Sequence, residues 1–278
     1  MSNNLEIVPL AAFSDNYIWI LRRGKQAAVV DPGDAAPVLA YLQQHSLELC
    51  AILITHHHHD HIGGIAEILA YSLANSRAPA QLPTQLPTQL PIYGPADEAI
   101  AEVNRPLAGG DKVTLAELNT SFEVIAVPGH TRGHIAYYGP EIAEQGVLFC
   151  GDTLFACGCG RIFEGTAEQM WHSLSRIAAL PAETKLYCAH EYTQANIRFA
   201  LAVEPDNAAL TARAAEVARL RAENLPTVPS TLACELATNP FLRWDAPAVI
   251  AAASHAGGGN PRQPELVFAA IREWKNKF

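Results

Sequence analysis

Residues 51–64 of the chain read AILITHHHHDHIGG, and this stretch decides the prediction of the fold. Residues 51–55 form an apolar run of the length of a buried strand, and Gly63 and Gly64 open a predicted helix. Between them, residues 56–61 read H-x-H-x-D-H. Four histidines in a row are typical of an expression tag, but a tag is not expected inside a strand-to-helix turn. The stretch therefore predicts a turn that presents metal ligands.

The spacing of these ligands indicates two cations. Residues two apart in an extended segment project to the same side, so His56 and His58 can share one cation. Asp60 and His61 are adjacent and must reach a different position as the turn tightens. Imidazole nitrogens and carboxylate oxygens together suit zinc, which we favour, and also suit iron or manganese.

Three more candidate ligands follow strand-like runs elsewhere in the chain. His130 follows EVIAVPG, Asp152 follows VLFCG, and His190 follows KLYCA. Loops at strand ends are where a rigid scaffold usually presents functional side chains. The prediction is a first site of His56, His58 and His130, a second site of Asp60, His61 and His190, and a bridging Asp152 that offers one oxygen to each cation.

Such a site favours hydrolysis. Two dications, two carboxylates and a bridging hydroxide leave a net charge of about +1, which attracts an anion or a developing oxyanion. Water bound to zinc has a pKa of about 7, compared with about 16 in bulk. We therefore predict that a hydroxide bridging the two metals attacks an activated carbonyl or a phosphoester without a Ser or Cys nucleophile, with Asp60 and Asp152 as the catalytic carboxylates that bind the metals.

Other polar residues near these motifs receive structural interpretations. His57 and His59 are expected to face away from the metals, and His134 is expected to hydrogen-bond behind the ligands. The cysteines lack C-x-x-C spacing and are interpreted as buried small hydrophobic residues. They are Cys50, Cys150, Cys157, Cys159, Cys188 and Cys234.

The chain divides into two predicted domains. Residues 1–190 alternate short β-rich runs with turns and a few helices, whereas residues 191–278 are rich in helix formers. A QLPT repeat lies in a proline-rich insertion at about 75–91, whose prolines forbid continuous helix or central strand. We expect an α/β domain followed by a smaller α-helical domain, with the insertion as an extended surface excursion away from the metals.

The bulk composition excludes several classes of protein. The chain has 278 residues and a net charge of −9, which disfavours a broad nucleic-acid surface. The first residues, MSNNLEIVPLAAF, have no basic region or apolar core of a signal peptide, and no run of 18 apolar residues occurs. We expect a cytoplasmic monomer with no membrane or nucleic-acid partner.

The ligand motifs together resemble the metallo-β-lactamase superfamily, whose fold is an αββα sandwich. A narrower resemblance, to the glyoxalase II (hydroxyacylglutathione hydrolase) family, covers nearly the whole chain. The motifs that carry it are FSDNY at 13–17, PGHTRGH at 128–134, GDTLFACGCGR at 151–161, EGT at 164–166, HEYT at 190–193 and NPFLR at 239–243.

The narrower resemblance implies a substrate and its binding residues. In that family a helical C-terminal domain helps to bind glutathione, and the enzyme converts S-D-lactoylglutathione to D-lactate and glutathione in methylglyoxal detoxification. The implied glutathione contacts in this chain are Arg161, Tyr192, Arg272 and Lys275. Arg272 and Lys275 are three residues apart on the last predicted helix and can share a face toward the glycine carboxylate. Phe163 stands where relatives often carry tyrosine, so a hydroxyl contact is lost there.

Two alternatives remain open from the sequence. One is a glutathione persulfide dioxygenase of the same fold, which typically uses one iron and lacks the extended helical domain. The other is a non-catalytic binder of metal or of a glutathione conjugate, which an intact bridging Asp152 disfavours. A superfamily nuclease is disfavoured by the net charge, and a secreted β-lactamase by the missing signal peptide.

Overall fold

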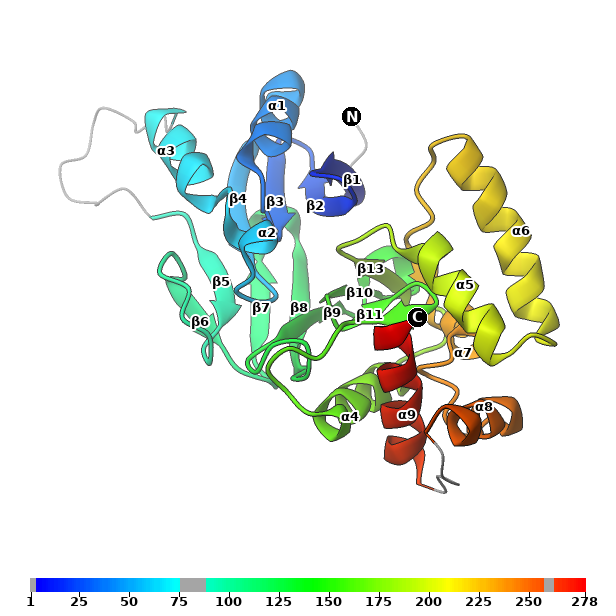
Figure 1. The fold of residues 1–278 in the computed structure, drawn as a ribbon. Coiled ribbons are helices and arrows are strands. Elements are labelled where there is room, and N and C mark those ends of the chain that lie inside the picture. Colours follow the sequence, from blue (N-terminus) through cyan, green and yellow to red (C-terminus); the bar gives the residue numbers. More distant parts are fainter. Residues whose placement is uncertain (1–3, 76–88, 258–262) are drawn as a thin grey trace, which may run out of the picture.

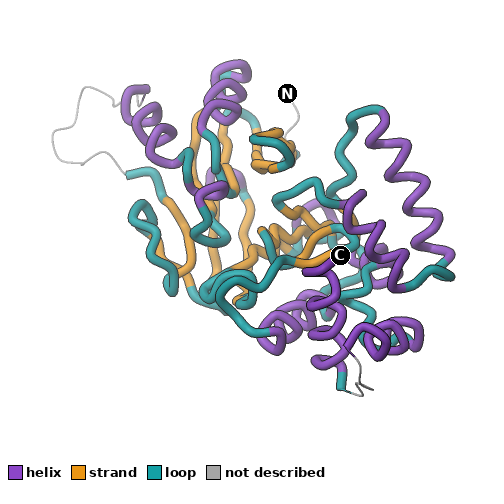
Figure 2. Tube along the Cα trace, viewed as in Figure 1, coloured by secondary structure: helices purple, strands orange, loops and turns teal. Residues whose placement is uncertain are grey.

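The structure is a computed structural model that describes residues 4–75, 89–257 and 263–278. Its centre consists of two six-stranded sheets, with helices on both sides of the pair (Figure 1). The same view coloured by secondary structure shows the strands enclosed between helices (Figure 2). The predicted α/β class, with an αββα sandwich followed by helices, is confirmed.

Both sheets mix parallel and antiparallel neighbours. In spatial order, the first sheet contains β1 (Glu6–Ala12), β2 (Asn16–Arg23), β3 (Gln26–Val30), β4 (Glu48–Leu53), β5 (Ile92–Pro95) and β6 (Arg105–Leu107). The second contains β14 (Ser230–Thr231), β13 (Lys185–Cys188), β10 (Val147–Gly151), β9 (Ile135–Gly139), β8 (Thr120–Ala126) and β7 (Lys112–Leu115). A small hairpin consists of β11 (Leu154–Phe155) and β12 (Gly158–Cys159).

The helices fall into an N-terminal and a C-terminal set. The first set contains α1 (Ala35–His45), α2 (His59–Ile62) and α3 (Ile65–Asn75), together with the 3-10 turns η1 (Ala116–Leu118) and η2 (Ile142–Glu144). The second contains α4 (Ala167–Ala178), α5 (Thr193–Val203), α6 (Ala208–Ala222), α7 (Leu232–Thr238), α8 (Pro247–Gly257) and α9 (Pro264–Lys277). Figure 1 shows α5 to α9 on the side of the molecule away from α1 and α3.

Strand β2 explains why the first sheet is buried on both faces. Trp19 and Leu21 belong to the core between the two sheets, whereas Ile18 and Ile20 belong to the cluster formed with α1 and α3. Successive side chains of a strand point to opposite faces, so an uninterrupted apolar run fills two cores at once. This arrangement holds the ends of the central strands in fixed positions.

The C-terminal segment is joined to the sandwich by more than helix packing. Strand β14 lies within this segment and pairs with β13 at the edge of the second sheet. Helix α4 begins with a capping box between Thr166 and Gln169, and it packs against α9. The C-terminal segment therefore shares a sheet with the α/β part, and the boundary at residues 190 and 191 stays a prediction.

Three further expectations concern the insertion, the cysteines and membrane-spanning helices. Most of the proline-rich insertion, residues 76–88, lies outside the described residues. The six cysteines are free; Cys50 and Cys234 are half-buried and the other four are buried. No helix among the described residues has the length and apolar character needed to cross a membrane.

Candidate metal centre

The candidate ligands come from the strand ends of both sheets. The turn between β4 and α2 carries His56 and His58, and α2 itself carries Asp60 and His61. The second sheet contributes His130 after β8, Asp152 after β10 and His190 after β13, and the structure places all seven side chains around one centre. Chain segments that are far apart in sequence therefore converge where the two sheets meet.

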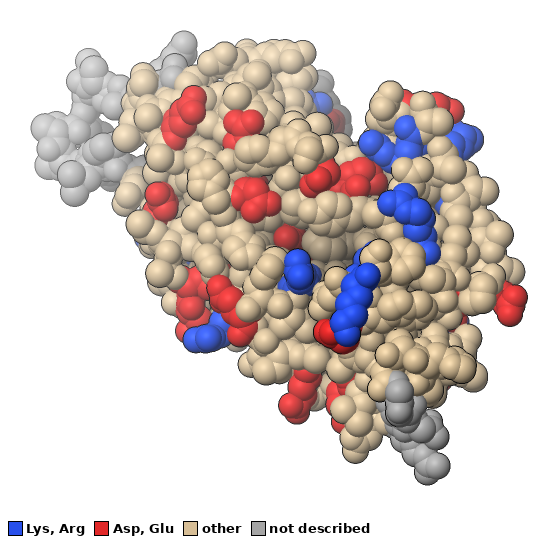
Figure 3. Space-filling model, in the orientation of Figure 1, with Lys and Arg blue, Asp and Glu red and all other residues tan. Residues whose placement is uncertain are grey.

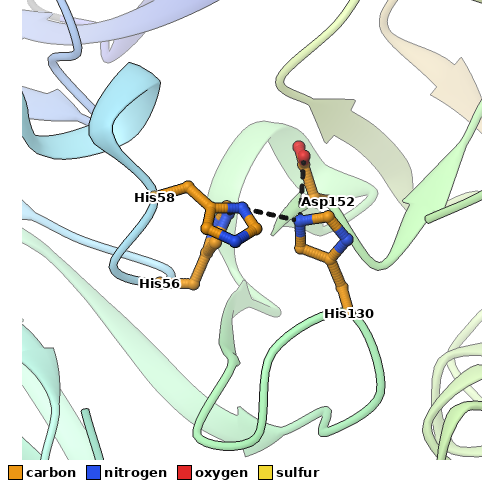
Figure 4. Close-up of side chains that lie close together, drawn as sticks. All are labelled: His56, His58, His130 and Asp152. Carbon is orange, nitrogen blue, oxygen red and sulfur yellow. Dashed lines mark hydrogen bonds and ion pairs between the residues drawn. The ribbon is translucent and has the colours of Figure 1, made fainter. Parts of the chain in front are cut away.

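The first group contains His56, His58, His130 and Asp152, whose candidate ligand atoms all lie within 4.8 Å of one another. Nδ1 of His58 lies 3.1 Å from Nε2 of His56 and 3.0 Å from Nε2 of His130. Nε2 of His130 lies 3.3 Å from Oδ2 of Asp152. Figure 4 shows the three imidazoles and the carboxylate turned toward one another. This donor set suits one divalent cation.

The second group contains Asp60, His61 and His190. Oδ2 of Asp60 lies 3.6 Å from Nε2 of His61 and 3.4 Å from Nε2 of His190. Oδ1 of Asp152 lies 3.5 Å and 3.4 Å from the same two nitrogens. The two oxygens of Asp152 thus face different groups, which is the position required of a bridging carboxylate.

Two buried atoms test whether these residues fit metal ions. Nε2 of His61 and Oδ1 of Asp152 are buried, and neither has a hydrogen-bond partner among the described residues. A buried polar atom without a partner costs about 1–3 kcal/mol, so native proteins rarely leave one. Both atoms point into the space between the ligands, where a cation would satisfy them. The residues fit a pair of divalent cations.

The outer nitrogens of the imidazoles are held by the protein, which orients the inner ones. Oγ1 of Thr55 donates to Oδ2 of Asp31 and therefore accepts from Nδ1 of His56, at 3.1 Å. The other outer contacts are His61 Nδ1 to Asp31 at 3.1 Å, His130 Nδ1 to the carbonyl oxygen of Arg161 at 2.8 Å, and His190 Nδ1 to Asp15 at 2.8 Å. Such partners typically raise metal affinity 10- to 100-fold.

Sequence reasoning did not single out Asp31 and Asp15 as partners of the ligands. Asp31 follows β3 directly, in AAVVDPG, so its place at a strand end was a usable signal. Asp15 lies in the FSDNY turn, where a carboxylate is ordinary, and only the tertiary structure brings it to His190.

The pKa shifts of His56 and Asp152 favour ligation, whereas the carboxylates of the centre outweigh burial and raise the pKa of His61 and that of His190, the latter to about 11. Burial, together with the neighbouring His61 and His134, holds the pKa of His56 well below its ordinary value, so the ring stays neutral. Burial alone raises the pKa of Asp152, but the charges of His61 and His190 lower it below its usual range. Neutral imidazole and ionised carboxylate are the forms that bind metal.

The remaining histidines lie around the ligands. Nδ1 and Nε2 of His57 face Glu98 at 3.0 Å and Glu164 at 3.3 Å, so this ring does not point at the metals. The ring of His59 is exposed. His134 stacks on His56 and accepts a hydrogen bond from the backbone N–H of Asp152 at 3.1 Å. The structure thus places His134 behind two ligands.

Two of the four implied glutathione contacts lie beside the metal centre. The ring of Tyr192 stacks on His190, with centroids 4.7 Å apart. Arg161 is exposed, and its guanidinium lies 5.7 Å from the ring centroid of Phe163. The Phe163 ring in turn meets those of His58 and His130 edge-on. The aromatic rings therefore line the approach to the metals.

The other two implied contacts lie on α9. Arg272 is buried, and its Nη1 donates to the carbonyl oxygens of Cys159 at 3.1 Å and Gly160 at 3.5 Å. Lys275 is half-buried, and its Nζ lies 4.9 Å from the ring centroid of Phe199. Burial, and then the charge of Arg272, lower the pKa of Lys275 to about 8. Much of the hydrogen-bonding capacity of Arg272 is therefore directed at the loop that follows Asp152.

That loop, residues 155–160, is held by side chains of the C-terminal helices. Nδ2 of Asn239 donates to the carbonyl oxygens of Phe155 and Gly158, at 3.1 and 2.9 Å. The buried Glu235 accepts from the backbone N–H of Cys157 at 2.8 Å and pairs with Arg213 at 2.5 Å. The C-terminal segment thus fixes the backbone between Asp152 and Arg161.

Charged side chains are segregated around the hollow between the sandwich and the C-terminal helices. Figure 3 shows acidic side chains on one side of this hollow and Lys and Arg on the other. A ligand that is anionic at one end and reacts at a metal centre at the other suits such a surface.

Two family models together match the chain from residue 12 to its last residue. The metallo-beta-lactamase superfamily model matches residues 12–190, and the model described as hydroxyacylglutathione hydrolase C-terminus matches residues 191–278. A hydroxyacylglutathione hydrolase of Nitrosomonas eutropha is 52% identical, covering 99% of both chains. One of Pseudomonas aeruginosa is 51% identical, covering 99% of this chain and 100% of the relative.

Solved structures share the fold. ETHE1 from Myxococcus xanthus has a TM-score of 0.59 at 24% identity, covering 96% of each chain. TTHA1623, solved in a di-iron-bound form, has a TM-score of 0.55 at 26% identity and covers 85% of this chain and 100% of its own. With relatives about half identical over their full length, the chain belongs to the metallo-beta-lactamase superfamily and, within it, to the hydroxyacylglutathione hydrolase family.

Proposed function

We propose that this enzyme hydrolyses hydroxyacyl thioesters of glutathione, with S-D-lactoylglutathione as its substrate and D-lactate and glutathione as its products. One observation carries the proposal: the two oxygens of Asp152 face two different groups of ligands in a protein of this family. Hydrolysis of this thioester gives the enzyme a role in methylglyoxal detoxification.

We propose that His56, His58, His130 and Asp152 hold one metal and that Asp60, His61, His190 and Asp152 hold the other. Two such cations would lower the pKa of a bound water and polarise the thioester carbonyl. We favour zinc, while iron or manganese also suits imidazole and carboxylate ligands. The di-iron form of the related fold supports a two-metal centre of this kind.

The protein residues would orient the reacting groups. Asn16 Nδ2 donates at 2.9 Å to Oδ2 of Asp60, the same oxygen that faces Nε2 of His61 and Nε2 of His190, and so orients this carboxylate. Asp31 and Asp15 hold the rings of His61 and His190, so the ligand atoms need little rearrangement when metal or substrate binds. Preorganised groups of this kind lower the activation barrier because they are not reorganised during the reaction.

We propose that the glutathione part of the substrate binds toward α9. Glutathione has two carboxylates, and the exposed Arg161 and the half-buried Lys275 can each receive one. Tyr192, next to the metal ligand His190, would contact the part of the substrate nearest the thioester. Arg272 would contribute through the loop carbonyls that it holds as well as through its charge.

The oligomeric state and the binding partners of the enzyme follow from the same reasoning. We propose that the enzyme acts as a monomer on a small molecule. A net charge of −9 supports the expectation that it does not bind nucleic acid. The dioxygenase alternative is disfavoured because residues 191–278 match the C-terminal model of the hydrolases.

A steady-state assay tests the proposed substrate. The purified chain is loaded separately with zinc, iron or manganese, and both thioester loss and released thiol are followed with S-D-lactoylglutathione. Glutathione persulfide with oxygen consumption as readout serves as the rival substrate, and Asp152→Asn is the matched control. Intact thioester in a protein that holds two metals, or oxygen uptake with the persulfide, contradicts the proposal.

A further inference from the structure

The first group of ligands is assembled from two separate loops. His56 and His58 lie in the turn after β4, whereas His130 lies in the connection between β8 and β9. Figure 4 shows these rings approaching each other from different parts of the chain. Because Nδ1 of His58 lies 3.0 Å from Nε2 of His130, a small displacement of either loop changes the space available for a cation.

A carboxylate outside the ligand set contacts both loops. Glu98 lies between β5 and β6, and its side chain is only 3% exposed. Its Oε2 faces Nδ1 of His57 at 3.0 Å, and its Oε1 accepts a hydrogen bond from the backbone N–H of Gly133 at 3.1 Å. The same Oε1 accepts a short hydrogen bond from Oγ1 of Thr131. The contacted residues are immediate neighbours of the ligands: His57 lies between His56 and His58, and Thr131 follows His130.

The fit around Glu98 is close. A methyl group built on Gly133 would lie 2.5 Å from Cγ of Glu98, so the loop approaches this side chain as only glycine permits. Thr131 is fully buried. A buried carboxylate with three donors at such distances has little freedom to move.

A second carboxylate, that of Glu164, contacts the same two loops from the solvent side. Oε1 of Glu164 lies 3.3 Å from Nε2 of His57, and its Oε2 accepts from the backbone N–H of Arg132 at 3.0 Å. Glu164 contacts the same two loops, but its side chain is 36% exposed. Exposed ionic contacts contribute little because water and salt screen them. Glu164 is therefore the natural control for Glu98.

We infer that Glu98 is a positioning residue that sets the separation of the two loops carrying His56, His58 and His130. It touches no candidate ligand atom of these residues and acts through His57 and Thr131. His61 and His190 of the second group are held by Asp31 and Asp15, and not by Glu98. The inference rests on the proposed metal sites and predicts a selective effect on one of them.

The test is metal binding by Glu98→Gln, compared with Glu164→Gln and the unmodified chain. The glutamine keeps the size of the side chain but presents a neutral amide to the two loops. Metal-free protein is titrated with zinc against a competing chelator, and the histidine ring signals are followed by NMR. We expect Glu98→Gln to weaken one of the two sites by about 10- to 100-fold, the range typical of residues that orient metal ligands.

The ring signals identify which site is weakened. In Glu98→Gln, the signals of His56, His58 and His130 should need more zinc to shift, while those of His61 and His190 should follow the unmodified chain. Glu164→Gln should bind both zinc ions with affinities within about twofold of the original. In the assay, Glu98→Gln should lower kcat and leave the KM for the thioester within about twofold, since no glutathione contact changes.

Several outcomes would overturn the inference. Unchanged zinc affinity at both sites in Glu98→Gln contradicts it, and so does an equal loss at both sites with a lowered melting temperature, which indicates a general structural role. If Glu98→Gln fails to fold, Thr131→Val removes one donor to the same carboxylate and should weaken the same site in the same direction. Because zinc titration uses no substrate, a wild-type chain that binds two zinc ions but leaves the thioester intact refutes the proposed function alone.

Discussion

The ring of Tyr192 stacks on the ring of His190, with centroids 4.7 Å apart and an interplanar angle of 7°. Asp15 adds to this contact, since it pairs with Nδ1 of His190 at 2.8 Å and also interacts with the hydroxyl of Tyr192. One aromatic side chain therefore serves both the proposed substrate surface and the orientation of a ligand. The two contributions can be separated by substitution.

Tyr192→Phe keeps the stacked ring and removes the hydroxyl. We expect KM for S-D-lactoylglutathione to rise about threefold to tenfold, corresponding to the loss of one hydrogen bond, with kcat nearly unchanged. Tyr192→Ala removes the ring as well and should also lower kcat and the zinc content, because His190 loses its support. Equal kinetic constants for the two variants would show that stacking has no role.

Asp152→Asn tests the bridging carboxylate. The amide has the same shape but offers only one oxygen, so it cannot serve both groups of ligands. We expect kcat to fall at least about 100-fold and the metal content, by elemental analysis, to fall below two ions per chain. Full activity with two metals bound would refute the bridging position.

The pKa of Lys275 predicts a pH dependence of substrate binding. Burial and Arg272 lower this pKa to about 8, so the ammonium is charged below that pH and neutral above it. An anion that binds this ammonium is therefore held at neutral pH and released as the pH rises. We expect KM to increase roughly tenfold between about pH 7 and pH 10, with little change in kcat.

Lys275→Arg provides the matched control for this pH profile. A guanidinium remains charged across the whole range, so the rise in KM near pH 8 should disappear. A profile with the same rise in both proteins assigns the titration to another group, such as the amino group of the substrate.

Removal of the metals should destabilise the fold. Nε2 of His61 and Oδ1 of Asp152 are buried, and no described residue gives either atom a hydrogen bond that could replace a cation. Zinc at 100 times its dissociation constant stabilises a protein by about 2.7 kcal/mol per site. For a chain of this size, dialysis against a chelator should lower the melting temperature by about 5–10 °C or more, measured by calorimetry, and added zinc should restore it. An unchanged melting temperature would contradict tight binding at this centre.

Asn239→Ala tests the support of the loop after Asp152. Loss of its two bonds to carbonyl oxygens should cost about 1–3 kcal/mol in the free energy of unfolding, measured in urea. Because the loop leads from Asp152 to Arg161, kcat should fall and KM should rise. Thr211→Ala, which removes an exposed helix contact in the same segment, should change neither. Equal kinetics in the two variants would show that the loop holds its position without Asn239.

Much of the fold and of the ligand set was predictable because the decisive signals are local. The run AILIT, the H-x-H-x-D-H spacing and the polar residues after apolar runs depend on strand burial and on nearest neighbours. The burial of the first sheet on both faces follows from an equally local rule, because successive side chains of a strand point to opposite faces. Ile18 and Trp19 therefore enter different cores. The metal ligands remain predictions until metal binding is measured.

The supporting contacts were not predictable, because they join distant parts of the chain. Glu98 and His57 are 41 residues apart in sequence, and Glu235 and Cys157 are 78 apart. A glutamate in a turn or a helix is usually exposed to solvent. Only their burial in the folded structure distinguishes Glu98 and Glu235 from such residues. The pairing of β14 with β13 is another such case, since a strand of two residues carries no periodicity.

The convergence of both sheets on one metal centre has a consequence for biosynthesis. The cluster at residues 56–61 leaves the ribosome about 130 residues before His190, an interval of roughly 6–26 s at 5–20 residues per second. Until Asp152 is translated, the nascent chain presents four adjacent imidazoles without the partners of the first group, and the second group stays incomplete until His190. Tight capture of the two proposed metal ions would therefore follow translation of both halves, and an occupied centre would mark a polypeptide whose two sheets have already joined.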